Sequence, residues 1–181
     1  MIRVYRKFDD VLSNQVLDIL TDCDKEFVPP LSSRNSTTQG SFSVGEAKGE
    51  IPAEYFENMK KQPILTAEED GTVMGFMSFK EDYVSDAVKN EFLPNVYIST
   101  VAVHHGYRGR GITKAFYKKL FELYPNRNIL TRTWSTNASH SGILSKMGFS
   151  EFLRIKDDRG VGTDTVYYCR RPEKIGNFDI L

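Results

Sequence analysis

The residues best suited to chemistry in this sequence of 181 residues form a basic glycine turn, HHGYRGRGI, at residues 104–112. A β-branched run, VYISTVAV, precedes the turn, and apolar residues at helical spacing follow it as far as Leu123. Gly109 and Gly111 therefore lie where a strand gives way to a helix, and glycine permits a tight turn there. The unpaired N–H groups of the helix, together with Arg108 and Arg110, predict a site for phosphate or pyrophosphate.

Two common phosphate-binding motifs do not fit this turn. The spacing from Gly106 to Gly111 matches the start of a P-loop, but Ile112 stands where that motif needs its phosphate-binding lysine. The dinucleotide-binding fingerprint needs a third glycine at the position of Lys114, and the turn follows three expected strands instead of opening a first βαβ unit. A nucleotide-hydrolysing site and a dinucleotide site are therefore both disfavoured.

The segment Arg108-Gly109-Arg110-Gly111-Ile112-Thr113 resembles the R-x-x-G-x-[G/A] signature of the GNAT superfamily of acyl-CoA-dependent N-acyltransferases, from which only Thr113 departs. A second stretch, NASHSGILSKMGF at residues 137–149, resembles the downstream signature of that family. There Leu144 occupies the position that in many relatives holds a tyrosine proposed to protonate the departing thiolate. More distantly, the segments RTWSTN, RGVGTDTVYY and VPPLSSRN resemble those of one GNAT subgroup.

The resemblance implies an α/β (α+β) fold: a mixed, mostly antiparallel sheet with helices on both faces and a V-shaped splay between two strands. It implies acetyl-CoA as co-substrate and no metal. In this sequence the co-substrate would be bound by Val101, Ala102, Val103, Arg108, Gly109, Arg110, Gly111, Ile112, Thr113 and Asn137. The N–H of Val101 would form a one-donor oxyanion site, and Asn137 would lie beside the pantetheine arm or the thioester sulfur. For Asn137, a role as a simple helix N-cap is an equally good interpretation.

The group that takes a proton from the amine is the least determined part of the chemistry. Candidates are Glu81, Tyr97, Ser99 and His140, or a water molecule held by backbone carbonyls. We expect direct attack in a ternary complex, so that Cys23 and Cys169 are dispensable reduced thiols. His104 and His105 are expected to cover the turn, because no carboxylate or cysteine at ligand spacing accompanies them.

Composition is consistent with one soluble enzyme domain over residues 1–181. Lys plus Arg and Asp plus Glu number 24 each, so no overall field attracts the chain to nucleic acid or to an anionic membrane. The N-terminus, MIRVYRKFDD, lacks an apolar signal core, and no run approaches the roughly 20 apolar residues of a membrane span. We therefore expect a cytoplasmic location and no nucleic-acid or membrane partner, with a homodimer left open.

The pattern along the chain predicts the element order β-α-(α)-β-β-β-α-β-α-β-β. Strands are expected at residues 2–7, 64–69, 73–80, 96–103, 129–134, 149–156 and 165–170. A first helix begins at Asp9 or Asp10 with Leu12, Val16, Ile19 and Leu20 on one apolar face, and a second covers residues 53–60. Residues 32–49 are expected to form a loop with a helical turn. The loop FVPPLSSRN is the best candidate for a lid over the acceptor, and Arg34 could bind a carboxylate there or simply lie at the surface.

Three functions stay open from the sequence. The first is an N-acetyltransferase that moves an acetyl group from acetyl-CoA to a primary amine of a small molecule, amino acid or peptide. The second is a regulatory module that binds acyl-CoA without turnover, which the leucine at position 144 makes conceivable. The third is an acetyltransferase that modifies a folded protein.

Overall fold

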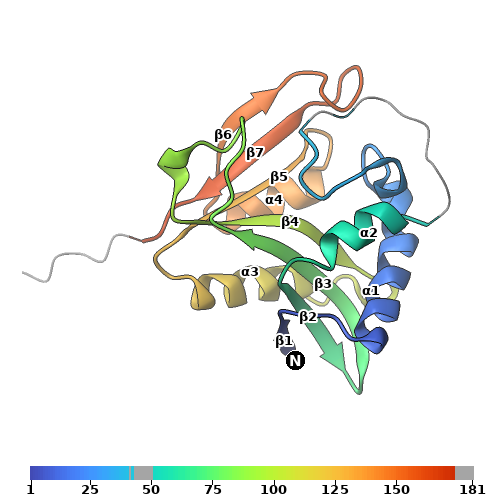
Figure 1. Ribbon diagram of the computed structural model, residues 1–181. Coiled ribbons are helices and arrows are strands. Elements are labelled where there is room, and N and C mark those ends of the chain that lie inside the picture. Colours follow the sequence, from blue (N-terminus) through green and yellow to red (C-terminus); the bar gives the residue numbers. More distant parts are fainter. Residues whose placement is uncertain (41, 43–50, 174–181) are drawn as a thin grey trace, which may run out of the picture.

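The computed structural model describes residues 1–40, 42 and 51–173, and in these residues seven strands form one sheet (Figure 1). The strand order is β1-β2-β3-β4-β5-β7-β6. The strands are β1 Ile2–Tyr5, β2 Ile64–Glu69, β3 Thr72–Glu81, β4 Asn95–Val103, β5 Asn128–Trp134, β6 Ser150–Ile155 and β7 Thr165–Arg170. The α-helices are α1 Asp10–Cys23, α2 Ala53–Met59, α3 Ile112–Leu123 and α4 Ala138–Lys146. This element order agrees with the order expected from the sequence.

The pairing of β4 with β5 positions the site. This pair is parallel, whereas the other paired strands of the described sheet are antiparallel. Its register runs from Asn95 opposite Asn128 to Ile98 opposite Thr131 and stops there. Residues 99–103 of β4 and 132–134 of β5 are therefore unpaired with each other, and the two strands separate into a V. The mostly antiparallel sheet and its strand splay confirm the fold class expected from the sequence.

Helices cover both faces of the sheet because successive strand residues point to opposite sides. Phe76 of β3 packs with α1 and α2, whereas its neighbour Met77 packs with α3 and α4. Helix α1 begins as predicted, since the Asp9 carboxylate accepts the N–H of Leu12 at 2.8 Å. The predicted apolar face of α1 is buried, consisting of Leu12, Val16, Ile19 and Leu20.

The sequence predicts the bounds of the last hairpin, β6 and β7, but only the tertiary structure decides which of its two strands joins the rest of the sheet. β7 lies between β5 and β6, so the later strand of the hairpin is the inner one. The reason is burial: Thr165, Val166 and Tyr167 of β7 are almost completely buried, whereas β6 exposes Glu151 and Arg154. Charged side chains of this kind suit an edge strand, because they disfavour pairing with another chain.

The stretch expected as a loop with a helical turn contains a short 3-10 helix at its start, Leu31–Ser33. Residues 41 and 43–49 of that stretch lie outside the described residues. No helix in the described ranges is long and apolar enough to cross a bilayer.

Candidate active site

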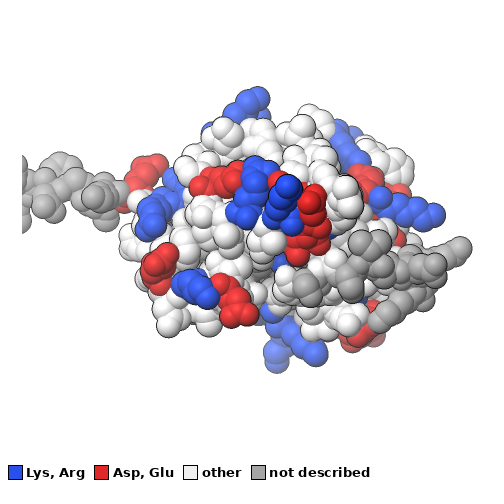
Figure 2. All heavy atoms as spheres, turned by 90° about the horizontal axis from the view of Figure 1, so that it is seen from above, with Lys and Arg blue, Asp and Glu red and all other residues white. Residues whose placement is uncertain are grey.

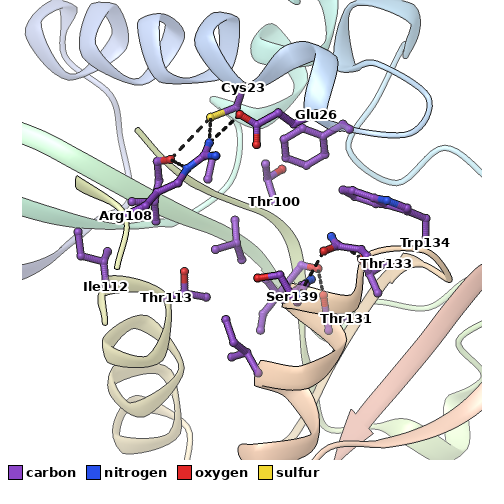
Figure 3. A pocket seen from close by; sticks show the side chains of 18 of the residues that line it. Cys23, Glu26, Thr100, Arg108, Ile112, Thr113, Thr131, Thr133, Trp134 and Ser139 are labelled. Carbon is purple, nitrogen blue, oxygen red and sulfur yellow. Dashed lines mark hydrogen bonds and ion pairs between the residues drawn. The ribbon is translucent and has the colours of Figure 1, made fainter. Parts of the chain in front are cut away.

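A cavity of about 640 Å³ opens between the separating strands β4 and β5 (Figure 3). It is lined by β4 and the start of α3, by β5 and α4, and by the end of α1 with the segment that follows it. Of the co-substrate residues expected from the sequence, those that line the cavity are Val101, Ala102, Val103, Arg108, Gly109, Gly111, Ile112, Thr113 and Asn137. Arg110 is not among the lining residues.

The glycine turn leaves open space at the start of α3. Gly109 and Gly111 both have a φ of +77°, and a Cβ atom added at either position would meet nothing within 4 Å. Gly111 is the N-cap of α3, and the first helical bond runs from the N–H of Ala115 to the Gly111 carbonyl at 3.0 Å. The N–H groups of Ile112 and Thr113 in the first turn therefore have no helical acceptor. This arrangement can bind an anion through backbone groups.

Both arginines of the turn form ion pairs, so they do not offer the unpaired positive charge that the sequence predicts at the anion site. Arg108 Nη2 forms an ion pair with Glu26 at 2.8 Å, and its Nε donates to the Val103 carbonyl at 3.0 Å (Figure 3). Arg110 is paired with Glu69 at 3.5 Å. The cation that lines the cavity in the first turn of α3 is Lys114, which sequence reasoning considered only as a mismatch to another motif.

The edge of β4 that faces the cavity carries unpaired backbone groups. The N–H of His104 donates to the Met74 carbonyl of β3 at 3.0 Å, so the strand alternation directs the N–H groups of Val101 and Val103 to the opposite edge. The Val103 carbonyl confirms this direction, because it accepts from Arg108 on the cavity side. Val101 therefore offers a backbone donor to a ligand between the strands.

Asn137 is the N-cap of α4 and also faces the cavity. Its Oδ1 accepts the N–H of His140 at 3.2 Å and caps α4, while its Nδ2 donates to Thr133 Oγ1 at 3.2 Å. The residue also lines the cavity.

His140 and Leu144 lie on the same helix but in different environments. His140 lines the cavity, and its Nε2 forms a hydrogen bond of 2.8 Å with the hydroxyl of Tyr117. Burial lowers the pKa of His140 to about 4, so the imidazole is neutral at pH 7. Leu144 is completely buried in the core beneath the cavity. The position of the usual tyrosine therefore contributes packing in this chain.

Two of the candidate bases lie outside the cavity. The Glu81 carboxylate accepts from the hydroxyl of Tyr124 at 2.6 Å and pairs with Arg6 at 3.2 Å, and these contacts hold its pKa below the usual value. Tyr97 is buried on the other face of the sheet, where burial raises the pKa of its hydroxyl. Ser99 does line the cavity, but its hydroxyl is bonded to Gln62 at 2.6 Å.

Three arginines line the part of the cavity formed by the segment after α1 and by the strand ends. Arg34, the residue chosen from the sequence, is one of them. Arg132 on β5 and Arg159 in the β6–β7 connection are the other two, and sequence reasoning missed them. The signal available was that all three lie in segments resembling one GNAT subgroup.

His104 and His105 stand at the surface beside the turn. His105 Nδ1 lies 2.8 Å from a carboxylate oxygen of Asp22, and the two imidazoles stack with their centres 4.3 Å apart. The ligand atoms of these three side chains are close enough together to hold a metal ion, but none of the three lines the cavity.

Comparison with known proteins agrees with this geometry. The Acetyltransferase (GNAT) family matches residues 26–149, and the chain belongs to this family. Among curated protein sequences, none matches the chain significantly.

Solved structures share the fold at low sequence identity. A ribosomal-protein-alanine N-acetyltransferase from Brucella melitensis is 18% identical with a TM-score of 0.61, covering 94% of this chain and 99% of its own. An N-acetyltransferase from Staphylococcus aureus Mu50 is 16% identical with a TM-score of 0.62, covering 94% and 98%. A Salmonella typhimurium structure that contains its cofactor acetyl-CoA is 15% identical with a TM-score of 0.62, covering 100% and 99%.

Proposed function

We propose that this chain transfers an acetyl group from acetyl-CoA to a primary amine of a small molecule, amino acid or peptide by direct attack in a ternary complex. The observation that carries the proposal is that one cavity joins a helix N-terminal anion site to an unpaired strand edge. An elongated thioester with a pyrophosphate at one end and an amide-containing arm needs this combination. The family membership and the acetyl-CoA of the Salmonella typhimurium structure support the choice of co-substrate.

The residues present fit such a co-substrate. The N–H groups at the start of α3 would bind the pyrophosphate in the open space above Gly109 and Gly111. Lys114 would add the positive charge that the paired arginines of the turn do not supply. The free edge of β4 would hold the pantetheine amides, beside Asn137.

Bound acetyl-CoA supplies the acetyl group as a thioester. The N–H of Val101 would donate to the thioester carbonyl oxygen and stabilise the negative charge that develops on it. A C–N bond forms, the C–S bond breaks, the amine loses one proton, and the sulfur gains one.

His140 is better suited to donating a hydrogen bond to the leaving sulfur than to accepting the proton of the amine. An imidazole with a pKa of about 4 is a weak base at pH 7, but in its neutral form it still carries one N–H. When Tyr117 donates to Nε2, that N–H is on Nδ1. We therefore assign to the Nδ1–H of His140 a hydrogen bond to the leaving sulfur as negative charge develops on it. Water supplies the proton that the sulfur gains and takes the proton that the amine loses.

A regulatory module that binds acyl-CoA without turnover is the second candidate, favoured by the buried leucine at position 144. One experiment separates the two: acetyl-CoA is mixed with a panel of primary amines, free thiol is measured, and products are identified by mass spectrometry. The transferase predicts thiol release that matches the N-acetylated amine one to one. Acetyl-CoA binding with no thiol release for any small amine or peptide would favour the regulatory module.

A further inference from the structure

Three guanidinium groups meet around one aromatic ring beside the cavity. The Cζ atoms of Arg34 and Arg132 each lie 4.9 Å from the centre of the Phe42 ring, and that of Arg159 lies 4.4 Å from it. Arg34 and Arg159 are only 7% and 6% exposed, and all three arginines line the cavity. Three like charges are thus concentrated where water has limited access.

Among the described residues, the hydrogen-bond acceptors of these guanidinium groups are all neutral oxygens, and they engage only some of the N–H donors. Arg34 donates through Nε and Nη2 to the Pro29 carbonyl at 3.0 and 2.7 Å. Arg132 donates through Nη1 to the Tyr167 hydroxyl at 3.1 Å and through Nη2 to the Gln39 carbonyl at 2.6 Å.

Arg159 follows the same pattern and leaves the same kind of spare donor. Its Nε donates to Thr165 Oγ1 at 2.9 Å and its Nη1 to the Val28 carbonyl at 2.6 Å. Within the described residues, Nη2 of Arg159, Nη1 of Arg34 and Nε of Arg132 have no partner. Every fully buried side-chain nitrogen described has a partner, so these three atoms are at least partly accessible. All three residues line the cavity.

No described carboxylate compensates the three charges through an ion pair. The buried carboxylate of Asp24 accepts from the backbone N–H and the hydroxyl of Ser32 at 2.6 and 2.8 Å. Asp158 accepts from Thr165. Burial, reinforced by the neighbouring guanidinium groups, lowers the pKa of Arg34 to about 10 and that of Arg159 to about 9.

The surface of the molecule shows the opposite arrangement. On the face shown in Figure 2, acidic and basic side chains lie next to one another. Arg108 and Arg110 are each paired with a glutamate. Uncompensated buried charges destabilise a fold, because they lose hydration and repel each other. A negative group that enters the cavity would restore both the hydrogen bonds and the charge balance.

We propose that the amine acceptor carries an oxyanion group, in the simplest case a carboxylate, and that Arg34, Arg132 and Arg159 bind it. This inference rests on the proposed acetyl transfer and names its substrate class. The three residues are specificity-determining, since each has one guanidinium nitrogen without a partner and a charged donor strengthens a hydrogen bond to an oxyanion.

The position of the cluster suits an acceptor that approaches from the face opposite the co-substrate. Along β5, Thr133 points to α4 and contacts Asn137, so Arg132 next to it points to the other face. Arg34 belongs to the segment predicted as the lid. The anionic end of the acceptor would lie in this cluster while its amine reaches the thioester near Val101.

The test compares matched acid and amide amines as acceptors: L-glutamate with L-glutamine, and L-aspartate with L-asparagine, each with acetyl-CoA and thiol detection. We expect kcat/KM to be about 10- to 100-fold higher for the acid of a pair, because a charge-assisted bond is lost in the amide. The variants Arg34→Gln, Arg132→Gln and Arg159→Lys should reduce this acid-to-amide ratio through KM and leave acetyl-CoA affinity unchanged. Arg171→Gln is the matched control, because Arg171 is exposed and lines a second, separate pocket.

A direct binding measurement keeps the inference separate from the proposed function. Calorimetry with coenzyme A present would use glutarate as the anionic probe and glutaramide as its neutral match. Glutarate binding that is weakened at least about 10-fold by Arg132→Gln or Arg159→Lys, but unchanged by Arg171→Gln, supports the anion site even if no amine is acetylated. Equal use of acids and amides, or no binding of glutarate, would overturn it. A purely structural role for the arginines would change thermal stability but not the preference for acid over amide.

Discussion

Replacement of Gly111 by aspartate is the most direct perturbation of the anion site. A side chain at this position would project into open space at the start of α3, where we place the pyrophosphate. The positive φ of +77° makes any L residue strained, at a cost of about 1 kcal/mol. Asparagine and aspartate tolerate this backbone region better than other residues, so both variants are expected to fold.

The magnitude follows from charge repulsion. A carboxylate at ~5 Å from one phosphate charge, with an effective dielectric constant of about 20, costs about 3 kcal/mol. This corresponds to a loss of acetyl-CoA affinity of about 100-fold. Gly111→Asn has the same shape and strain without the charge, and we expect its Kd to rise by no more than about 10-fold.

Calorimetry would measure the Kd of acetyl-CoA for the parent, Gly111→Asn and Gly111→Asp, with circular dichroism as the check on folding. The difference between the two variants should shrink at ~1 M salt, because exposed charges are then screened within about 3 Å. Equal affinity of folded Gly111→Asp and the parent protein would refute the assignment of the turn to phosphate binding.

Three further outcomes are expected. Cys23→Ala should retain turnover, because burial raises the pKa of this thiol to about 11 and leaves it protonated at pH 7; loss of activity in a folded, acetyl-CoA-binding variant would indicate a covalent route. Arg108→Gln should lower the free energy of unfolding by ~1–2 kcal/mol in denaturant titrations, because the Arg108 side chain links the Val103 carbonyl to Glu26. Its acetyl-CoA affinity should change only a few-fold. A much larger loss of affinity would mean that the charge of Arg108 contacts the ligand. The pKa of His140 is lowered to about 4 in the folded state, so on acidification the imidazole takes up its proton at a higher pH in the unfolded chain than in the folded one. The free energy of unfolding should therefore fall by ~1–2 kcal/mol as the pH drops from about 6.5 to 4. The imidazole of His140 is partly exposed, so we expect less than the stability change that the whole pKa shift would give. In unfolding measurements, His140→Gln should remove this contribution to the pH dependence of stability.

Local patterns in the sequence determine much of this protein. Apolar spacing and an aspartate cap specify α1, and Asp70-Gly71 between two β-rich runs specifies the hairpin of β2 and β3. Glycines at the end of a β-branched run specify the strand-to-helix turn at Gly111, because glycine adopts a positive φ without the strain that a side chain adds. These features depend on neighbours within a few positions of each other, so they can be predicted without the fold.

Tertiary structure decides which charges are free and which residues meet. Arg108 is basic in the sequence, but only the fold places Glu26 beside it. Likewise, the partners of the Glu81 carboxylate are Arg6, just after β1, and Tyr124, just after α3, and both are far away in the chain. Arg34, Arg132 and Arg159 are distributed over more than half of the sequence and form one cluster only because β4 and β5 separate beyond Ile98. Charge compensation and burial are sums over neighbours in space, and spacing along the chain carries little information about them.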